Sequence, residues 1–437
     1  MLKSRLCIAF FAFAVGCAPA QKPLTDYVNP MLGTATLWDS VDLGFKPTKR
    51  TWGAEVFPGS SLPNAMVQVS PVTKFHSGAG YQYEDSVIYG FTHTNKGHWN
   101  LCHIPLLPVT GTPTPGDYCS PFSHERESAA PGYYQVFLDR YGVDAQLSST
   151  LRCAFHKYTY PAGAAASLLA DLQRSNEHVR AWDIRKEGDN VFAGWQQTGE
   201  KMYFYAVANR PVTGIEPVVE GDREVRIVRF GEGDGALELR IGFSFVSEKN
   251  ARENLEAEML GKSFAEVRSE ATATWNDLLG RIRVEGGTER EKGLFYSSLY
   301  RSFLWPALRS DVNGEFTDVD GKVINPGFRY YTGPSYWDDY RNKLILLGML
   351  APDVAADVIS SDTDKGEKRG GSCPRSSTAT TLRRSWPGLT CAATAASTST
   401  VPTTSCCATL RYRARAARGS TSILPRGTFR KWTSRIP

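Results

Sequence analysis

The sequence has little cysteine in the part that should fold. Nine cysteines are present, but four lie after residue 370 and two within the first twenty residues, which leaves Cys102, Cys119 and Cys153. An odd number at no ligand-like spacing predicts neither a disulfide framework nor a zinc site. Histidine is absent after His178, so any imidazole chemistry must come from the first half of the chain.

Acidic residues are missing from one end of the chain. Residues 371–437 hold 11 Lys+Arg and no Asp or Glu, whereas the first 370 residues hold 39 Lys+Arg and 45 Asp+Glu. The main body is therefore mildly acidic and has no basic surface of the kind that binds nucleic acid. At 437 residues and 41% hydrophobic, the chain can build large packed cores, which excludes disorder throughout.

Long apolar runs are missing except at the start. Residues 6–15 are apolar and follow two basic residues, so residues 1–20 are predicted to be a signal peptide that is too short to span a bilayer. Ala18-Pro19-Ala20 fits a cleavage site, and Val15-Gly16-Cys17 is an imperfect lipoprotein box. We expect export without a transmembrane segment, to the periplasm, to the outer membrane as a lipoprotein, or to the extracellular space.

Residues 24–250 have the pattern of short strands. Turn signals such as Phe57-Pro58-Gly59 interrupt the chain repeatedly. Residues 237–245 are apolar at every second position, which is typical of a half-buried antiparallel strand. These features predict an N-terminal antiparallel β-sandwich domain over 24–250.

The apolar period then changes to that of helices. Ser263 and Glu266 form a capping-box signal. One helical face after it carries Phe264, Val267, Ala271, Trp275 and Leu278. Further helices are predicted over 289–305 and from about Trp337. We therefore expect a helical connector at 251–284 and, at 285–370, the opening part of a helical domain too short to close its own core.

Residues 371–437 do not have the composition of a folded segment. They contain 23 Ser+Thr and 10 Arg and show no apolar periodicity. One interpretation is a disordered basic tail. The other is a change of reading frame near Gly371, because permitted codons read one step off give protein-like stretches, including Phe-Leu-Pro-Pro-Phe-Phe-His-Gly-Asp-His. We favour the frame change.

The densest polar and aromatic segment surrounds three histidines. His93, His98 and His103 recur every five residues, a spacing that does not bring side chains together on a strand or a helix, so no metal site is predicted. Aromatic, imidazole and amide groups together suit a carbohydrate pocket. The predicted substrate-binding residues here are His93, His98, Trp99 and Asn100; ordinary turn packing is the alternative.

A second candidate is Trp337-Asp338-Asp339-Tyr340-Arg341. The segment is explained structurally as a helix start, where Asp favours the dipole and pairs with Arg341. In the functional interpretation, Trp337, Asp338 and Arg341 bind substrate. Adjacent Asp residues diverge on any regular element, so they cannot be the acid and base of a glycosidase, and no catalytic pair is recognised.

Several short motifs occur in a characteristic order before residue 371. They include Tyr27-Val28-Asn29-Pro30, Gly80-Tyr81-Gln82-Tyr83, Gly90-Phe91-Thr92-His93-Thr94, Phe295-Tyr296-Ser297-Ser298-Leu299-Tyr300 and Trp337-Asp338-Asp339-Tyr340-Arg341. Through these motifs the chain resembles glycoside hydrolase family 92, a family of exported bacterial α-mannosidases. One departure is Lys96-Gly97-His98-Trp99-Asn100, where many members have Ser-Gly-Thr-Gly.

The resemblance implies a β-sandwich followed by an (α/α)6 barrel, with calcium at the active site. It also implies exo-acting hydrolysis of α-mannoside glycans, α-1,2-linked ones foremost, with inversion between two carboxyl groups roughly 6.5–9.5 Å apart. Family members carry those carboxyl groups and most calcium ligands beyond the point where this frame breaks, so the chain as written is expected to be an inactive fragment. A non-catalytic carbohydrate-binding β-sandwich protein is the alternative, although it would not need the helices.

Overall fold

The computed structural model describes residues 22–36, 44, 54–95, 101–233, 235–334, 339 and 342–368. The chain divides into two compact units, residues 1–305 and 306–437. In their described parts, the first unit holds two large β-sheets and three α-helices, and the second holds a small hairpin and two α-helices.

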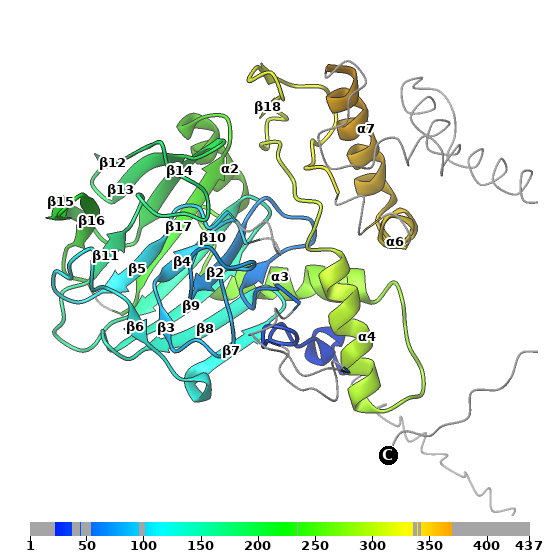
Figure 1. Ribbon diagram of the computed structural model, residues 1–437, viewed down its shortest axis with the longest axis horizontal. Helices are drawn as coiled ribbons and strands as arrows, with labels where there is room; N and C mark the ends of the chain where they lie inside the picture. The colour runs from blue at the N-terminus through cyan, green and yellow to red at the C-terminus, as the bar shows by residue number, and fades with distance from the viewer. Residues whose placement is uncertain are drawn as a thin grey trace, which may run out of the picture. The chain divides into compact units, whose positions relative to one another are not determined.

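Two antiparallel sheets form the first unit (Figure 1). The seven-stranded sheet has the order β1 (Ser60–Ser61), β2 (Gln68–Val72), β4 (Gly90–Thr92), β5 (Leu106–Val109), β11 (Ser167–Ala170), β16 (Arg223–Phe230), β15 (Val212–Glu220). The eight-stranded sheet has the order β12 (Ala181–Gly188), β13 (Val191–Gln197), β14 (Lys201–Ala208), β17 (Leu237–Ser244), β10 (Cys153–Thr159), β9 (Val143–Ser149), β8 (Tyr133–Leu138), β7 (Glu127–Ala130). A minor pair joins β3 (Val87–Ile88) and β6 (Ser120–Pro121), and short 3-10 helices lie at Leu24–Tyr27 and His124–Arg126.

Side chains that point inward from both sheets build the core between them. In β14 every second residue is buried, and its Phe204 lies opposite Phe243 of β17. In β10, His156 and Tyr158 point the same way, toward the interior. The buried face is therefore mostly apolar, with a few polar side chains at fixed register positions.

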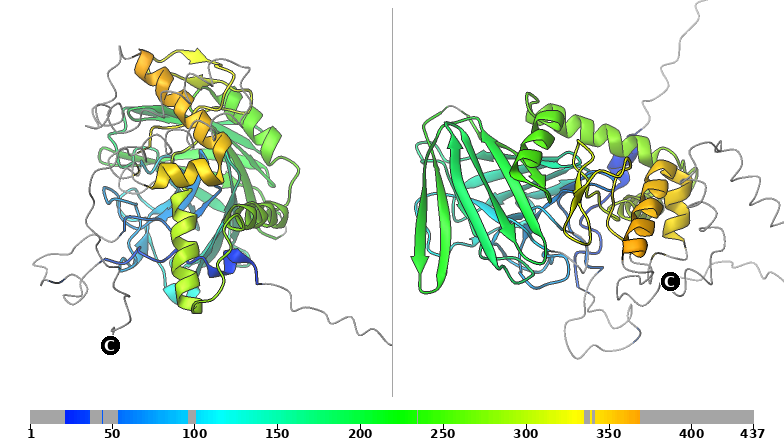
Figure 2. Two further views of the ribbon diagram at one scale, coloured as in Figure 1. Left: turned by 90° about the vertical axis from the view of Figure 1, so that its right-hand side faces the viewer. Right: turned by 90° about the horizontal axis from the view of Figure 1, so that it is seen from above.

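Two helices cover the outer face of the eight-stranded sheet: α2 (Glu248–Glu258) packs on β17 and β14, and α3 (Phe264–Leu279) packs on β9 and β10 (Figure 2). The cluster beneath them consists of Tyr133, Cys153, Phe155, Leu255, Met259, Phe264 and Val267. At the end of α2, Glu258 accepts hydrogen bonds from Thr150 and from Arg152, whose Nη1 lies 2.6 Å from Oε1. A charge-assisted contact therefore fixes the helix to the β9–β10 turn.

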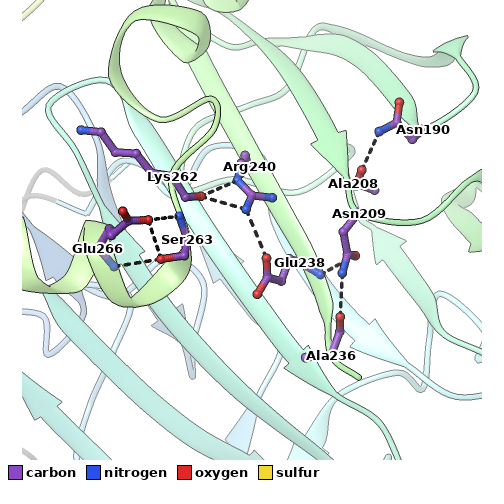
Figure 3. Close-up of polar contacts among 9 residues, drawn as sticks. All are labelled: Asn190, Ala208, Asn209, Ala236, Glu238, Arg240, Lys262, Ser263 and Glu266. Atoms are coloured by element: carbon purple, nitrogen blue, oxygen red, sulfur yellow. Dashed lines mark hydrogen bonds and ion pairs between the residues drawn. The ribbon is translucent and has the colours of Figure 1, made fainter. Parts of the chain in front are cut away.

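The start of α3 is fixed to β17 (Figure 3). Arg240 donates from Nε and Nη2 to the carbonyl oxygen of Lys262, at 3.1 and 2.8 Å, and contacts Glu238. Ser263, which follows Lys262, forms the capping box with Glu266. The chain therefore turns into the helix at a point held by both side chain and backbone.

The third helix of this unit, α4 (Glu289–Ser302), packs on α3 and on the N-terminal 3-10 helix. Trp275 of α3 is fully buried, lies 4.4 Å from the Tyr300 ring between centroids, and donates from Nε1 to the carbonyl oxygen of Ser61 at 2.7 Å. Arg301 donates to the carbonyl oxygens of Pro30 and Leu32. These contacts join the helices to β1 and to the N-terminal segment.

The second unit is described as a hairpin of β18 (Phe316–Thr317) and β19 (Val323–Ile324), with α6 (Lys343–Leu350) packed on α7 (Pro352–Lys368). The backbone N–H of Tyr331 donates to Ser361, and Lys365 donates to the carbonyl oxygen of Tyr331. On α6, Ile345 and Met349 are 43% and 70% exposed, so this helix presents an apolar face.

The predicted order, an antiparallel β-sandwich followed by helices, is confirmed. The alternation over 237–245 is β17, and the capping box begins α3 as predicted. The helix predicted over 289–305 ends earlier, at Ser302, because Phe303 leaves the helical conformation. Helices α2 and α7 were not predicted individually. The predicted start near Trp337 and the whole of 371–437 lie outside the described residues.

Trp275 provides a test of how strongly the helices stabilise the sandwich. Trp275→Ala should lower the free energy of unfolding by about 3–5 kcal/mol, because it leaves a cavity and an unpaired carbonyl at Ser61. Trp275→Phe should cost less, since most of the ring remains. Chemical denaturation followed by circular dichroism measures both, with the exposed His178→Ala as control. Equal stability of all the variants would show that α3 does not support the sandwich.

Candidate functional site

Among the predicted site residues, His93 is the one within the described part of the chain. His98, Trp99 and Asn100, like Trp337, Asp338 and Arg341, lie outside the described residues. The site can therefore be built from the residues that flank 96–100. We call His93, Thr94, Asn95, Leu101, Cys102 and His103 the loop base.

Backbone hydrogen bonds close the loop base. The N–H of His93 donates to the carbonyl oxygen of His103 at 3.1 Å. The N–H groups of Leu101 and Cys102 both donate to the carbonyl oxygen of Thr94, each at 3.2 Å. Cys102 and Ile104 have φ values of 51° and 54°. Left-handed backbone at a β-branched residue is strained and persists only where its surroundings fix it, and such strain is concentrated at functional positions.

His93 connects the two sheets. His93 directly follows β4 of one sheet, and its Nε2 lies 3.0 Å from Nε2 of His156 on β10 of the other sheet. His156 Nδ1 lies 2.6 Å from the Tyr158 hydroxyl, and the His93 ring lies 4.4 Å from the ring of Phe243. His93 is fully buried. Its ring therefore packs in the core between the two sheets and holds the loop base there. A direct contact of His93 with a sugar stays a prediction.

His103 and Asn95 fix the two sides of the loop base. The ring of His103 lies 3.1 Å from Thr94 Oγ1 through Nδ1 and 3.0 Å from Thr198 Oγ1 through Nε2. The Asn95 amide donates to the carbonyl oxygens of Gln68 and Thr92, both at 2.8 Å. All these side chains are buried, so the distances between the two ends of 96–100 are set by hydrogen bonds in a dry environment.

Gln196 of β13 extends this support. It accepts from the N–H of Ile104 at 2.8 Å and donates to the carbonyl oxygens of Leu172 and Arg174, both at 2.9 Å. The N–H of Asn176 donates to the carbonyl oxygen of Leu101. In the sequence, His103 stands out only through the histidine spacing. Asn95, His156, Gln196 and Thr198 carry no local signal and are not predicted as site residues.

Burial controls the charge of this network. It lowers the pKa of His93 to about 3, although backbone groups of His103 and Ile104 act in the opposite direction. It also lowers the pKa of His156 well below the usual value, and it raises the pKa of Tyr158 well above 10. The pair is thus neutral at physiological pH and does not act there as a cationic general acid.

The described residues do not supply a metal site of their own. Nowhere within them do three or more His, Cys, Asp or Glu side chains converge as ion ligands would. Cys102, Cys119 and Cys153 form no disulfide among the described residues. The calcium implied by the resemblance therefore finds no fitting donor set among the described residues.

In the second unit, Asp339 is the described member of the second candidate segment. It is buried, and Lys343, four residues later, lies 3.3 Å from its carboxylate. The structural explanation names a pairing with Arg341, which lies outside the described residues, so this contact does not test it. The predicted sugar contacts of Trp337, Asp338 and Arg341 remain predictions.

Comparison with known proteins identifies two adjoining domains. The family model of the glycosyl hydrolase family 92 N-terminal domain matches residues 27–253, and that of the family 92 catalytic domain matches residues 250–402. The second match continues past Gly371 into the segment without acidic residues. A protein of Arthroderma benhamiae described as an uncharacterized secreted glycosidase is 24% identical over 344 residues, covering 66% of this chain and 42% of its own.

Solved structures of family GH92 proteins also match this chain. The family GH92 α-mannosidase BT3965 from Bacteroides thetaiotaomicron matches with a TM-score of 0.72 and 26% identity, over 80% of this chain and 50% of its own. The inverting mannosidase BT2199 of the same organism matches with a TM-score of 0.69 and 25% identity, over 80% and 49%. The chain thus spans about half the length of these relatives. Within the described residues, each helix is too short or too polar to cross a membrane.

The buried histidine pair makes the stability of the first unit depend on pH. Because the pKa of His93 is about 3 in the folded chain and about 6.5 when unfolded, its contribution is complete above pH 6.5 and is lost as the pH falls toward 3. His93→Gln should flatten the fall in unfolding free energy between pH 6.5 and 4, by up to about 1.4 kcal/mol per pH unit. Denaturation at several pH values measures this.

The exposed His178→Gln is the matched control and should keep the wild-type slope. A His93→Gln slope equal to that of wild type would show that His93 does not exclude a proton in the folded chain.

Proposed function

The chain belongs to glycosyl hydrolase family 92, and on that premise we propose that its intact gene product is an α-mannosidase. The observation that carries the proposal is the pair of adjoining family matches, which together run from residue 27 to 402. Two solved relatives with TM-scores of about 0.7 are mannosidases, and one of them, BT3965, has also been solved with mannoimidazole bound.

The reaction we propose is exo-acting hydrolysis that releases mannose with inversion, from α-1,2-linked mannosides foremost. In such a reaction one carboxylic acid protonates the leaving oxygen, and a second carboxylate activates water on the opposite face of the sugar. BT2199 is described as an inverting mannosidase, which supports this stereochemistry. We also propose calcium dependence, for which the family resemblance is the support.

The first unit contributes a support for substrate contacts in this proposal. Residues 96–100 are joined in sequence to the two sides of the loop base, where hydrogen bonds hold Asn95 and His103. A neutral, hydrogen-bonded support keeps a binding segment in place without a charge that would need compensation. Trp99 would then supply an apolar face for mannose, and Asp338 and Arg341 would bond its hydroxyls.

We propose that the chain as written is exported and inactive. Export is supported by the leader-like residues 1–20 and by the relative described as secreted. Inactivity is supported by the composition of 371–437, which lacks any acid for general acid catalysis, and by the apolar face on α6.

Hydrolysis provides the direct test of the proposed activity. A version with the reading frame restored after Gly370 should release mannose from α-1,2-mannobiose, lose activity with a calcium chelator and recover it when calcium is returned. The chain as written should release none. Product analysis by NMR should show the β-anomer first, because inversion changes the anomeric configuration. An inactive restored enzyme in saturating calcium, or turnover by the chain as written, contradicts the proposal.

Substitution of Asp338 distinguishes a role in substrate binding from a role at the start of a helix. In the restored enzyme, Asp338→Ala should lower kcat/KM at least tenfold while the melting temperature stays near that of wild type, since hydrogen bonds to sugar hydroxyls are lost. Asp339→Ala is the matched control: it removes a buried partner of Lys343 and should act mainly on stability. Near-wild-type kcat/KM for Asp338→Ala would return this residue to a helix-start role.

A further inference from the structure

A block of four side chains stands on the outer face of the eight-stranded sheet. Trp195 and Gln197 lie on β13, directly opposite Tyr203 and Lys201 on β14. Their neighbours in sequence, Gln196, Met202 and Phe204, are buried, so the four point away from the core and are half-buried. We call Trp195, Gln197, Lys201 and Tyr203 the aromatic block.

The polar groups of the aromatic block have no partner within the described part of the chain. The Trp195 indole N–H, the Gln197 amide and the Tyr203 hydroxyl make no hydrogen bond there, and Lys201 makes no ion pair. Lys201 Nζ instead lies 3.5 Å from the centroid of the Trp195 ring and 4.9 Å from that of Tyr203. By contrast, Arg185 on the neighbouring strand pairs with Asp183, Glu187 and Glu248.

The arrangement on the sheet is flat and open to one side. Cross-strand partners stand about 5 Å apart and alternate residues of one strand about 7 Å apart, so the block covers an area close to that of one sugar ring. On β12, Ala181 is the partner of Gln197, and its small side chain leaves that flank uncovered. A ligand can therefore extend across the edge strand.

From this juxtaposition we propose that the aromatic block is a surface site for a glycan; that the glycan contains mannose rests on the proposed function. The face of Trp195 that Lys201 does not cover, and the ring of Tyr203, take the apolar faces of sugars, and the donors beside them take hydroxyl oxygens. Asp183 lies opposite Trp195 and is paired with Arg185, so its carboxylate is already compensated.

Binding can be measured on the full chain without any catalytic activity. Native gel electrophoresis in gels containing α-linked mannan should retard the wild-type chain, and a gel without polysaccharide gives the reference mobility. The double variant Trp195→Ala with Tyr203→Ala should bind at least tenfold more weakly. The double variant Gln197→Ala with Lys201→Met keeps both rings and should weaken binding at least threefold, which tests the site even where loss of the rings disturbs folding.

The matched control is Tyr83→Ala, which removes another exposed aromatic ring, 40% exposed and stacked on His124. It should be retarded like wild type. Unretarded wild type, wild-type retardation of both block variants, or loss of retardation in Tyr83→Ala overturns the proposal. A failed mannoside hydrolysis assay leaves this result standing, because retardation does not require turnover.

Discussion

The structure of the first unit depends on a polar contact made inside an apolar core. The imidazoles of His93 and His156 meet at 3.0 Å between the two sheets, and the Tyr158 hydroxyl completes the row. A neutral hydrogen bond contributes only about 1 kcal/mol when it is made, but an unpaired buried partner costs about 1–3 kcal/mol. The contact therefore contributes less to overall stability than to register: His93 Nδ1 already lacks a partner among the described residues, and other alignments of the two sheets would leave a second buried nitrogen unpaired.

That constraint extends to the loop base. Gln196 of β13 and Thr198, which directly follows that strand, hold Ile104 and His103 on the C-terminal side of the loop base. The eight-stranded sheet thus helps to set the geometry of residues 101–104, which lie outside its strands. The strained backbone at Cys102 and Ile104 is consistent with this arrangement, because strain persists where several contacts fix the same atoms.

The fold could be predicted from sequence wherever its cause is local. Alternation fixed β17, and the capping box located α3 to the residue, because both depend on neighbours within four positions. Helix α2 has only a narrow buried stripe, so its period was missed. The support of the loop base could not be predicted, since His93 and His156 are 63 residues apart in sequence and His103 and Thr198 are 95 apart. Only the packed sandwich brings them together.

The hairpin of β13 and β14 shows how tightly the two faces are coupled. Gln196 points inward to the loop base, and Phe204 points inward to the core. Trp195, Lys201 and Tyr203, at alternate positions of the same strands, point outward and belong to the aromatic block. Because side chains alternate with a period of two, a slip of one residue would bury the ammonium of Lys201 and expose Phe204. Burying that charge without a partner is far more costly than any gain from re-pairing the backbone. The alternation of side chains that keeps the core dry therefore also keeps the aromatic block on the surface.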